Sequence, residues 1–119
     1  MGLQEIKEKI PEMDIETGLE FCADDEEFYW EMLGDYASDE KSELLNRLYS
    51  EKNWGGYELE VHSLKSTSRM MGFVELGDMC EELQKAAGAK DESTIMLKHG
   101  PMMDRFTRYI EIIQNEIGL

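Results

Sequence analysis

The chain has 119 residues and a formal net charge of −15 at pH 7. This length suits one domain that buries a single hydrophobic core without metals or disulfides. The negative charge argues against a nucleic-acid partner, because a protein that binds phosphates needs a basic face. No apolar run is long enough to span a bilayer, and no signal-peptide pattern is present. We therefore expect no membrane contact, a cytoplasmic location, and reduced thiols at Cys22 and Cys80.

The residue pattern predicts an all-α protein. Methionine is abundant, with nine residues, and proline is scarce, with two. Glu, Lys, Leu and Met favour helices, and no β-branched run alternates cleanly enough for a strand. Short connections between consecutive helices make neighbours antiparallel. The sequence therefore predicts an antiparallel four-helix bundle with a short N-terminal helical cap.

The expected organisation is an N-terminal extension over residues 1–13 and a bundle domain over residues 14–117. In the extension, residues 4–10 form a short amphipathic turn that Pro11 stops. Asp14 begins a brief helix that leads into the domain. Longer helices are expected over 24–36, 39–52, 54–71, 74–87 and 92–117. Because these are five elements for four bundle positions, we expect the first to lie across the bundle end.

Local signals mark most helix boundaries. The predicted N-caps are Asp24, Ser38, Asn53 and Asp91. Glu27 completes a capping box in the first longer helix, and Asp39 favours the first turn of the next. Gly72 and Gly88 close their helices. Along the first longer helix, Phe28, Met32 and Tyr36 share one face, with Tyr29 and Leu33 alongside.

The last helix contains a helix-breaking dipeptide. Gly100-Pro101 is expected to kink or interrupt it, because proline removes one backbone donor and clashes with the preceding turn. His99 stands just before this dipeptide and has no lysine one turn on. We therefore interpret His99 as structural or exposed.

The stretch from Glu58 to Gly72 divides into two faces when read as a helix at about 100° per residue. Spacings of three and four define a buried stripe: Tyr57, Val61, Leu64, Ser68 and Met71. A second stripe faces solvent: Glu58, His62, Lys65, Ser66 and Arg69. The imidazole is thus predicted to be exposed, with two cations and a hydroxyl beside it.

These residues resemble a known motif. His62-Ser63-Leu64-Lys65-Ser66, followed by Gly72, resembles the His-x-Leu-Lys-Gly motif and second glycine of histidine-containing phosphotransfer (HPt) domains. Four further landmarks are similar to that family: Asp14–Leu19, Asp24–Tyr29, Asn53-Trp54 and Leu83-Gln84. The resemblance covers residues 14 to 117. Its one clear departure is Ser66, which replaces the usual glycine.

The resemblance implies a phosphocarrier of a two-component phosphorelay. His62 would accept the phosphoryl group, since an exposed neutral imidazole is nucleophilic. Lys65 would meet the phosphoryl oxygens as a point charge. Ser66 could donate a hydrogen bond or merely be small, and Arg69 could contact phosphate or form a salt bridge. Gln84 would bond the other ring nitrogen of the histidine.

The implied partners are receiver domains of response regulators or hybrid kinases. The chain would take a phosphoryl group from the phospho-aspartate of one receiver and pass it to another, as a monomer. We expect no enzyme activity and no cofactor of its own, because no Gly-rich nucleotide loop is present. The Mg²⁺ would belong to the receiver. The chain could also be a domain of a hybrid histidine kinase.

Two other classes of helical protein are alternatives to a phosphocarrier. A di-iron carboxylate bundle needs Glu-x-x-His pairs, but Leu59 and Met96 stand three residues before the two histidines. No metal site is therefore expected. A helical adaptor that kept the fold and lost phosphorylation is the remaining alternative, against which His62 and Lys65 count.

Overall fold

The computed structural model describes residues 2–38 and 40–118, which form seven α-helices and no strand. The helices are α1 Leu3–Lys9, α2 Ile15–Phe21, α3 Glu26–Ser38, α4 Lys41–Ser50, α5 Trp54–Met70, α6 Val74–Gly88 and α7 Glu92–Ile117. The predicted all-α fold class is confirmed. Among the described helices, none has the length and apolar character needed to cross a membrane.

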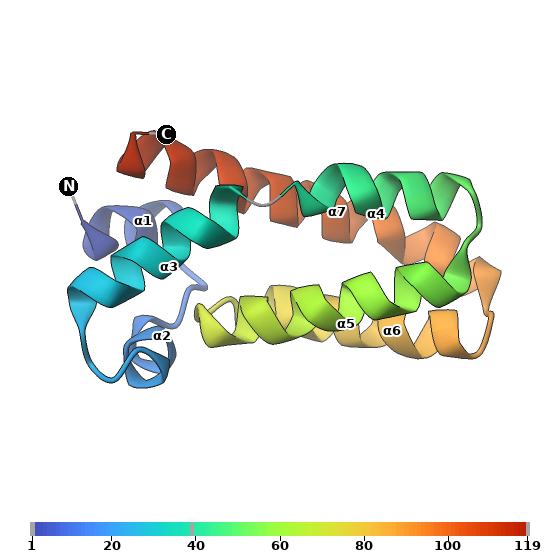
Figure 1. Cartoon of the computed structure of the whole chain (residues 1–119), viewed down its shortest axis with the longest axis horizontal. Coiled ribbons are helices and arrows are strands. Elements are labelled where there is room, and N and C mark those ends of the chain that lie inside the picture. Colours follow the sequence, from blue (N-terminus) through green and yellow to red (C-terminus); the bar gives the residue numbers. More distant parts are fainter. Residues whose placement is uncertain (1, 39, 119) are drawn as a thin grey trace.

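The longer helices run along one another. Figure 1 shows α5, α6 and α7 running in alternating directions, with α3 and α4 following one another along one side. The most extensive pairing is between α5 and α6, while α7 packs against α6 and α3, and α4 packs against α5. The expectation that the helix around 24–36 crosses the bundle end is therefore wrong. Instead, α3 continues the line of α4 and packs along α7.

The N-terminal cap consists of α1 and α2, and it is fixed at two places. Glu12, just after α1, accepts a hydrogen bond from the Tyr109 hydroxyl at 2.6 Å. It also forms an ion pair with Arg108 at 3.0 Å, and both partners lie on α7. The Asp14 amide donates to the Gly72 carbonyl at 2.8 Å. Three side chains of the first thirteen residues are fully buried in the common core: Ile6, Ile10 and Met13.

The buried face of α5 is the one predicted. Val61, Leu64 and Met71 are all buried. Ser68 on the same stripe is also buried, and its hydroxyl shares a 2.8 Å hydrogen bond with the Tyr36 hydroxyl of α3. That bond satisfies a polar group that would otherwise be costly in the core.

On α3 the buried face agrees with the prediction in part, since Tyr36 is buried and so are Tyr29 and Leu33 alongside it. Phe28 is 45% exposed, whereas Tyr29 and Leu33 are fully buried. Tyr29 decides the orientation, because its hydroxyl donates to the Met71 carbonyl at 2.6 Å. Its ring also lies against Gly18, where an added Cβ would be 2.1 Å from ring atoms. Contacts with α5 and α2 therefore rotate α3 away from the Phe28 face.

Two predicted caps are confirmed. Asn53 accepts from the Gly56 amide at 3.0 Å, and Asp91 accepts from the Thr94 amide at 3.2 Å.

Gly72 has a φ of 90°, and a Cβ there would lie 2.2 Å from the Asp14 carbonyl oxygen. Glycine is therefore required at this helix end by both conformation and space.

Two other predicted caps are wrong. The first turn of α3 is capped by Asp25, which accepts from the Phe28 amide at 3.1 Å, whereas Asp24 lies in the preceding turn with a φ of 60°. Ser38 ends α3 instead of beginning α4, and its hydroxyl donates to the Asp35 carbonyl at 3.0 Å. The prediction for Asp39 lies outside the described residues.

The long helix α7 continues through Pro101 without interruption. The expected interruption is therefore wrong, and the kink stays a prediction. A proline ring normally clashes with the Cβ of the residue before it, but that residue is Gly100, which has no Cβ. The carbonyl that loses its helical donor belongs to Leu97, which is 72% exposed, so water can satisfy it.

Candidate functional site

His62 lies on the outward side of α5 and is exposed. The buried Leu64 lies about 200° away around the helix axis. Within the described parts of the chain, the hydrogen bonds found do not involve the imidazole of His62. On the flank of α5 that faces α4, the Lys41 ammonium donates hydrogen bonds to Glu60 at 2.8 Å and to Ser63 at 3.0 Å. The ring nitrogens of His62 are therefore accessible from solvent.

Lys65 of α5 and Gln84 of α6 line the same surface cleft. They line one cleft of about 310 Å³ between α5 and α6, together with Glu58, Glu81 and Lys85. The ion pairs found in residues 2–38 and 40–118 do not include Lys65, so its ammonium is available to an added anion. Of the residues around this cleft, Glu81 and Lys85 were not predicted from the sequence, and Glu81 is the one that also contacts Arg69. Its position one turn before Gln84 on α6 is the signal that could have indicated it.

Gln84 carries an unsatisfied acceptor. Its Oε1 atom is buried and has no hydrogen-bond partner among the described residues. Buried side-chain oxygens nearly always accept a hydrogen bond, so this atom is a position where a donor is missing. In the structure no hydrogen bond joins it to His62.

Arg69 is held against α6. Its guanidinium donates to Asp78 at 2.9 Å and lies 3.4 Å from Glu81. The hydrogen bond to Asp78 and the nearby charge of Glu81 raise the pKa of Arg69. A Cβ at position 77 would lie 2.5 Å from the Arg69 Cγ, so Gly77 makes room for this side chain. Of the two roles expected for Arg69, the salt bridge is observed, and phosphate contact stays a prediction.

Ser66 is half-buried and lies one turn after His62. It is about 40° from the histidine around the helix axis, so both side chains leave α5 on the same side. On the other side of the histidine, Leu59 is 70% exposed. The residues one turn before and one turn after the imidazole are therefore an exposed leucine and a small serine.

His99, the second histidine, is part of the core. It is 5% exposed, and its ring stacks on Tyr49 of α4 with centroids 3.9 Å apart. Nε2 donates to the Asn46 Oδ1 at 2.9 Å, and Nδ1 accepts from the Tyr57 hydroxyl at 2.7 Å. Burial lowers the pKa of His99 to about 4. Of the two interpretations of His99, structural and exposed, the structural one is correct.

Within the described residues, no group of three or more His, Cys, Asp or Glu side chains is placed to hold a metal ion. The thiols of Cys22 and Cys80 are free and buried. Burial raises the pKa of Cys80 to about 12, which makes it a poor nucleophile or ligand.

Comparison with known proteins identifies the family. The family model described as "Hpt domain" matches residues 29–116, a span that contains His62 and Lys65. No curated protein and no solved structure matches the chain. A match over most of the chain is sufficient to assign the family. The chain therefore belongs to the Hpt domain family, whose members carry phosphoryl groups in histidine-containing phosphotransfer of two-component signalling and are not kinases with an ATP site of their own.

Proposed function

We propose that His62 accepts a phosphoryl group from the phospho-aspartate of one receiver domain and passes it to the aspartate of another. The observation that supports this proposal best is the exposed imidazole together with the Lys65 cation, one turn along the same face of α5, which forms no ion pair within the described residues. In an Hpt domain this combination supplies both the nucleophile and the counter-charge that phosphoryl transfer needs.

The proposed transfer is a simple displacement. A lone pair of a His62 ring nitrogen attacks phosphorus, the acyl phosphate P–O bond breaks, and the aspartate leaves as a carboxylate. The reverse steps deliver the group to the second receiver. Charge on the equatorial oxygens is met on this chain by the Lys65 ammonium. The Mg²⁺ that the chemistry requires is held by the receiver.

Gln84 is proposed to orient the imidazole. Once one ring nitrogen of His62 carries phosphorus, the other carries a proton and needs an acceptor. The Gln84 Oε1 is an acceptor that lacks a donor, and it lies at the cleft that Lys65 also lines. A hydrogen bond between the two would fix which nitrogen faces the phosphoryl group.

The other two candidate residues have secondary roles in the proposal. Ser66 has a small side chain, which leaves room for a receiver domain to approach His62. Arg69 could reach a phosphoryl group only by giving up its bond to Asp78, which favours Lys65 as the main cation. We further propose that the partners are receiver domains of response regulators or hybrid kinases. The chain is proposed to act as a monomer in the cytoplasm.

The test is transfer from a phosphorylated receiver domain. Wild-type protein and His99→Gln should both gain acid-labile label, and His62→Gln should gain none while its helical circular dichroism stays unchanged. Because His62 is exposed, its replacement should not affect folding. Label on His62→Gln would exclude this residue as the acceptor. A wild-type chain that gains no label from any receiver, yet binds one, would favour the helical adaptor instead.

A further inference from the structure

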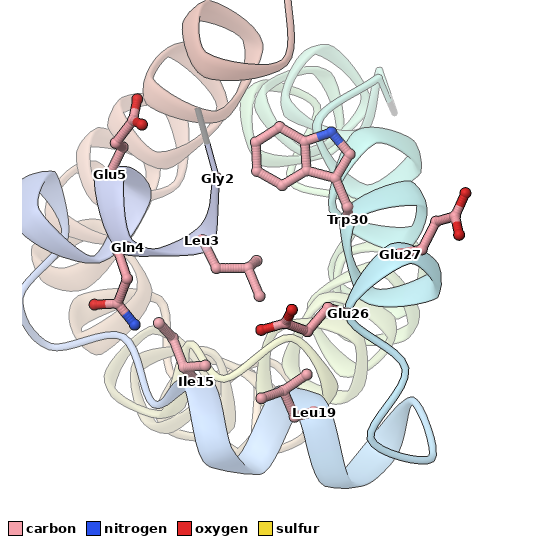
Figure 2. Close-up of a pocket in the computed structure, with 9 residues that line it drawn as sticks. All are labelled: Gly2, Leu3, Gln4, Glu5, Ile15, Leu19, Glu26, Glu27 and Trp30. Atoms are coloured by element: carbon pink, nitrogen blue, oxygen red, sulfur yellow. The ribbon is translucent and has the colours of Figure 1, made fainter.

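A second concave site lies in the N-terminal cap, among helices that the proposed phosphotransfer does not use. Residues of α1, α2 and α3, with Gly2 just before α1, line an open cavity of about 630 Å³. Figure 2 shows apolar side chains around it from all three helices: Leu3, Ile15, Leu19 and Trp30. Its volume falls within the range of small-molecule sites, about 300–1,000 Å³. None of the residues proposed for phosphotransfer lines it.

A carboxylate is directed into this cavity. Figure 2 shows the Glu26 side chain pointing into the space between Leu3 and Leu19, whereas Glu27 points away. The salt bridges found in the described residues do not include Glu26, and no lysine or arginine is among the residues that line the cavity. Among the described residues, the Glu26 carboxylate therefore lies beside four apolar side chains, and the polar residues of the lining, Gln4, Glu5 and Glu27, include no lysine or arginine.

We infer that this cavity binds a small organic ammonium ion, a primary amine carried on an aromatic or alkyl body. The ammonium would donate a charge-assisted hydrogen bond to the Glu26 carboxylate. The apolar body would fill the space against Leu3 and Leu19, and the Trp30 indole offers a ring face to the ligand. Anionic ligands would be repelled by the Glu26 carboxylate, so its charge selects the sign of the ligand.

Occupancy would also stabilise the cap. The walls come from α1, α2 and the beginning of α3, at one end of the molecule (Figure 1). A ligand that contacts all three binds only the folded arrangement. It should therefore raise the melting temperature in proportion to its affinity and concentration.

Trp30 provides a direct readout. The chain has two tryptophans, so Trp54→Phe leaves Trp30 as the only indole. We would titrate this variant with 2-phenylethylamine and, as a neutral counterpart of the same shape, with 2-phenylethanol. The amine should change Trp30 fluorescence saturably and bind at least about tenfold more tightly than the alcohol, because a charged hydrogen bond is lost in the alcohol. Thermal shift on the wild-type chain repeats the comparison without the Trp54 substitution.

Two variants test whether the Glu26 carboxylate is the charge that binds the amine. Glu26→Gln should reduce the affinity for the amine to that of the alcohol. Glu31→Gln, an exposed glutamate on the same helix that does not line the cavity, should leave it unchanged. Equal binding of amine and alcohol, equal effects of the two variants, or no saturable signal up to the solubility limit of the amine would each overturn the inference. Failure here would leave transfer to His62 unaffected, so the two proposals can fail separately.

Discussion

The Arg69 side chain crosses α6 directly over Gly77, with so little space that a Cβ at position 77 would lie 2.5 Å from the Arg69 Cγ. The guanidinium ends between Asp78 and Glu81. Lys65, one turn earlier on α5, has no such partner in the described residues. The two cations beside His62 are therefore not equivalent: one is neutralised by α6, and the other is free to meet an added charge.

This difference predicts unequal effects of removing the two cations. Lys65→Ala should slow phosphotransfer roughly ten- to a hundredfold, because a charge-assisted contact contributes about 1.5–3 kcal/mol. Arg69→Ala should slow transfer less than about tenfold. Its loss should lower the free energy of unfolding by no more than about 1 kcal/mol, as expected for partly exposed ion pairs. Single-turnover transfer rates and urea unfolding measure the two effects. An unchanged rate in Lys65→Ala would assign this residue to the surface alone.

His99 predicts a pH-dependent stability. Burial lowers the pKa of its imidazole to about 4, whereas the unfolded chain has an ordinary value near 6.5. The unfolded state therefore binds a proton first as the pH falls. The contribution of His99 to the free energy of unfolding should be fully present above about pH 6.5. It should decline by roughly 3 kcal/mol at most between that pH and about pH 4, and it should not decline further at lower pH.

Urea unfolding of wild type and His99→Gln at pH 7 and pH 4.5 tests this prediction. The wild type should lose more stability than the variant between the two pH values. The carboxyl groups are common to both proteins, so their contribution cancels in the comparison. His62→Gln, which removes an exposed histidine, should behave like the wild type. Parallel pH profiles for wild type and His99→Gln would show that His99 is protonated in the folded state.

Leu64 and Leu59 offer a matched test of the two faces of α5. Leu64 is 1% exposed and Leu59 is 70% exposed. Leu64→Ala should lower the free energy of unfolding by about 2–5 kcal/mol, since it leaves a cavity in the core. Leu59→Ala should change it by less than about 0.5 kcal/mol. A larger loss from Leu59 than from Leu64 would mean that the helix is rotated relative to this structure.

Ser66 tests where the receiver docks. Ser66→Gly should leave transfer within about a factor of ten, because a single neutral hydrogen bond contributes about 1 kcal/mol. Ser66→Tyr should block transfer while the bundle stays folded, since the ring would stand beside His62 on the outward face. Glu111→Tyr, an equally bulky change at an exposed position of α7, should transfer normally. Normal transfer by Ser66→Tyr would place the docking surface elsewhere.

The sequence by itself determined the elements that depend on local spacing. The alternation of three and four along α5 placed Val61 and Leu64 inward and His62 outward, because a helix repeats every 3.6 residues wherever it is packed. Asn53 and Asp91 were predicted as caps for a similar reason. A cap bonds an amide only three residues away, although the same local rule failed at Asp24 and Ser38.

Only the tertiary structure decided features in which separate segments compete. Phe28 and Tyr29 offer α3 two neighbouring apolar faces, and the choice came from Gly18 and Met71, which belong to other helices. The burial of His99 depends on Asn46 and Tyr57, which lie far away in the chain. Likewise, the pattern on α5 treats Lys65 and Arg69 as similar cations, and only the packing of α6 distinguishes them. Periodicity specifies the direction of a side chain from its own helix, but the partner it meets is set by how the helices pack together.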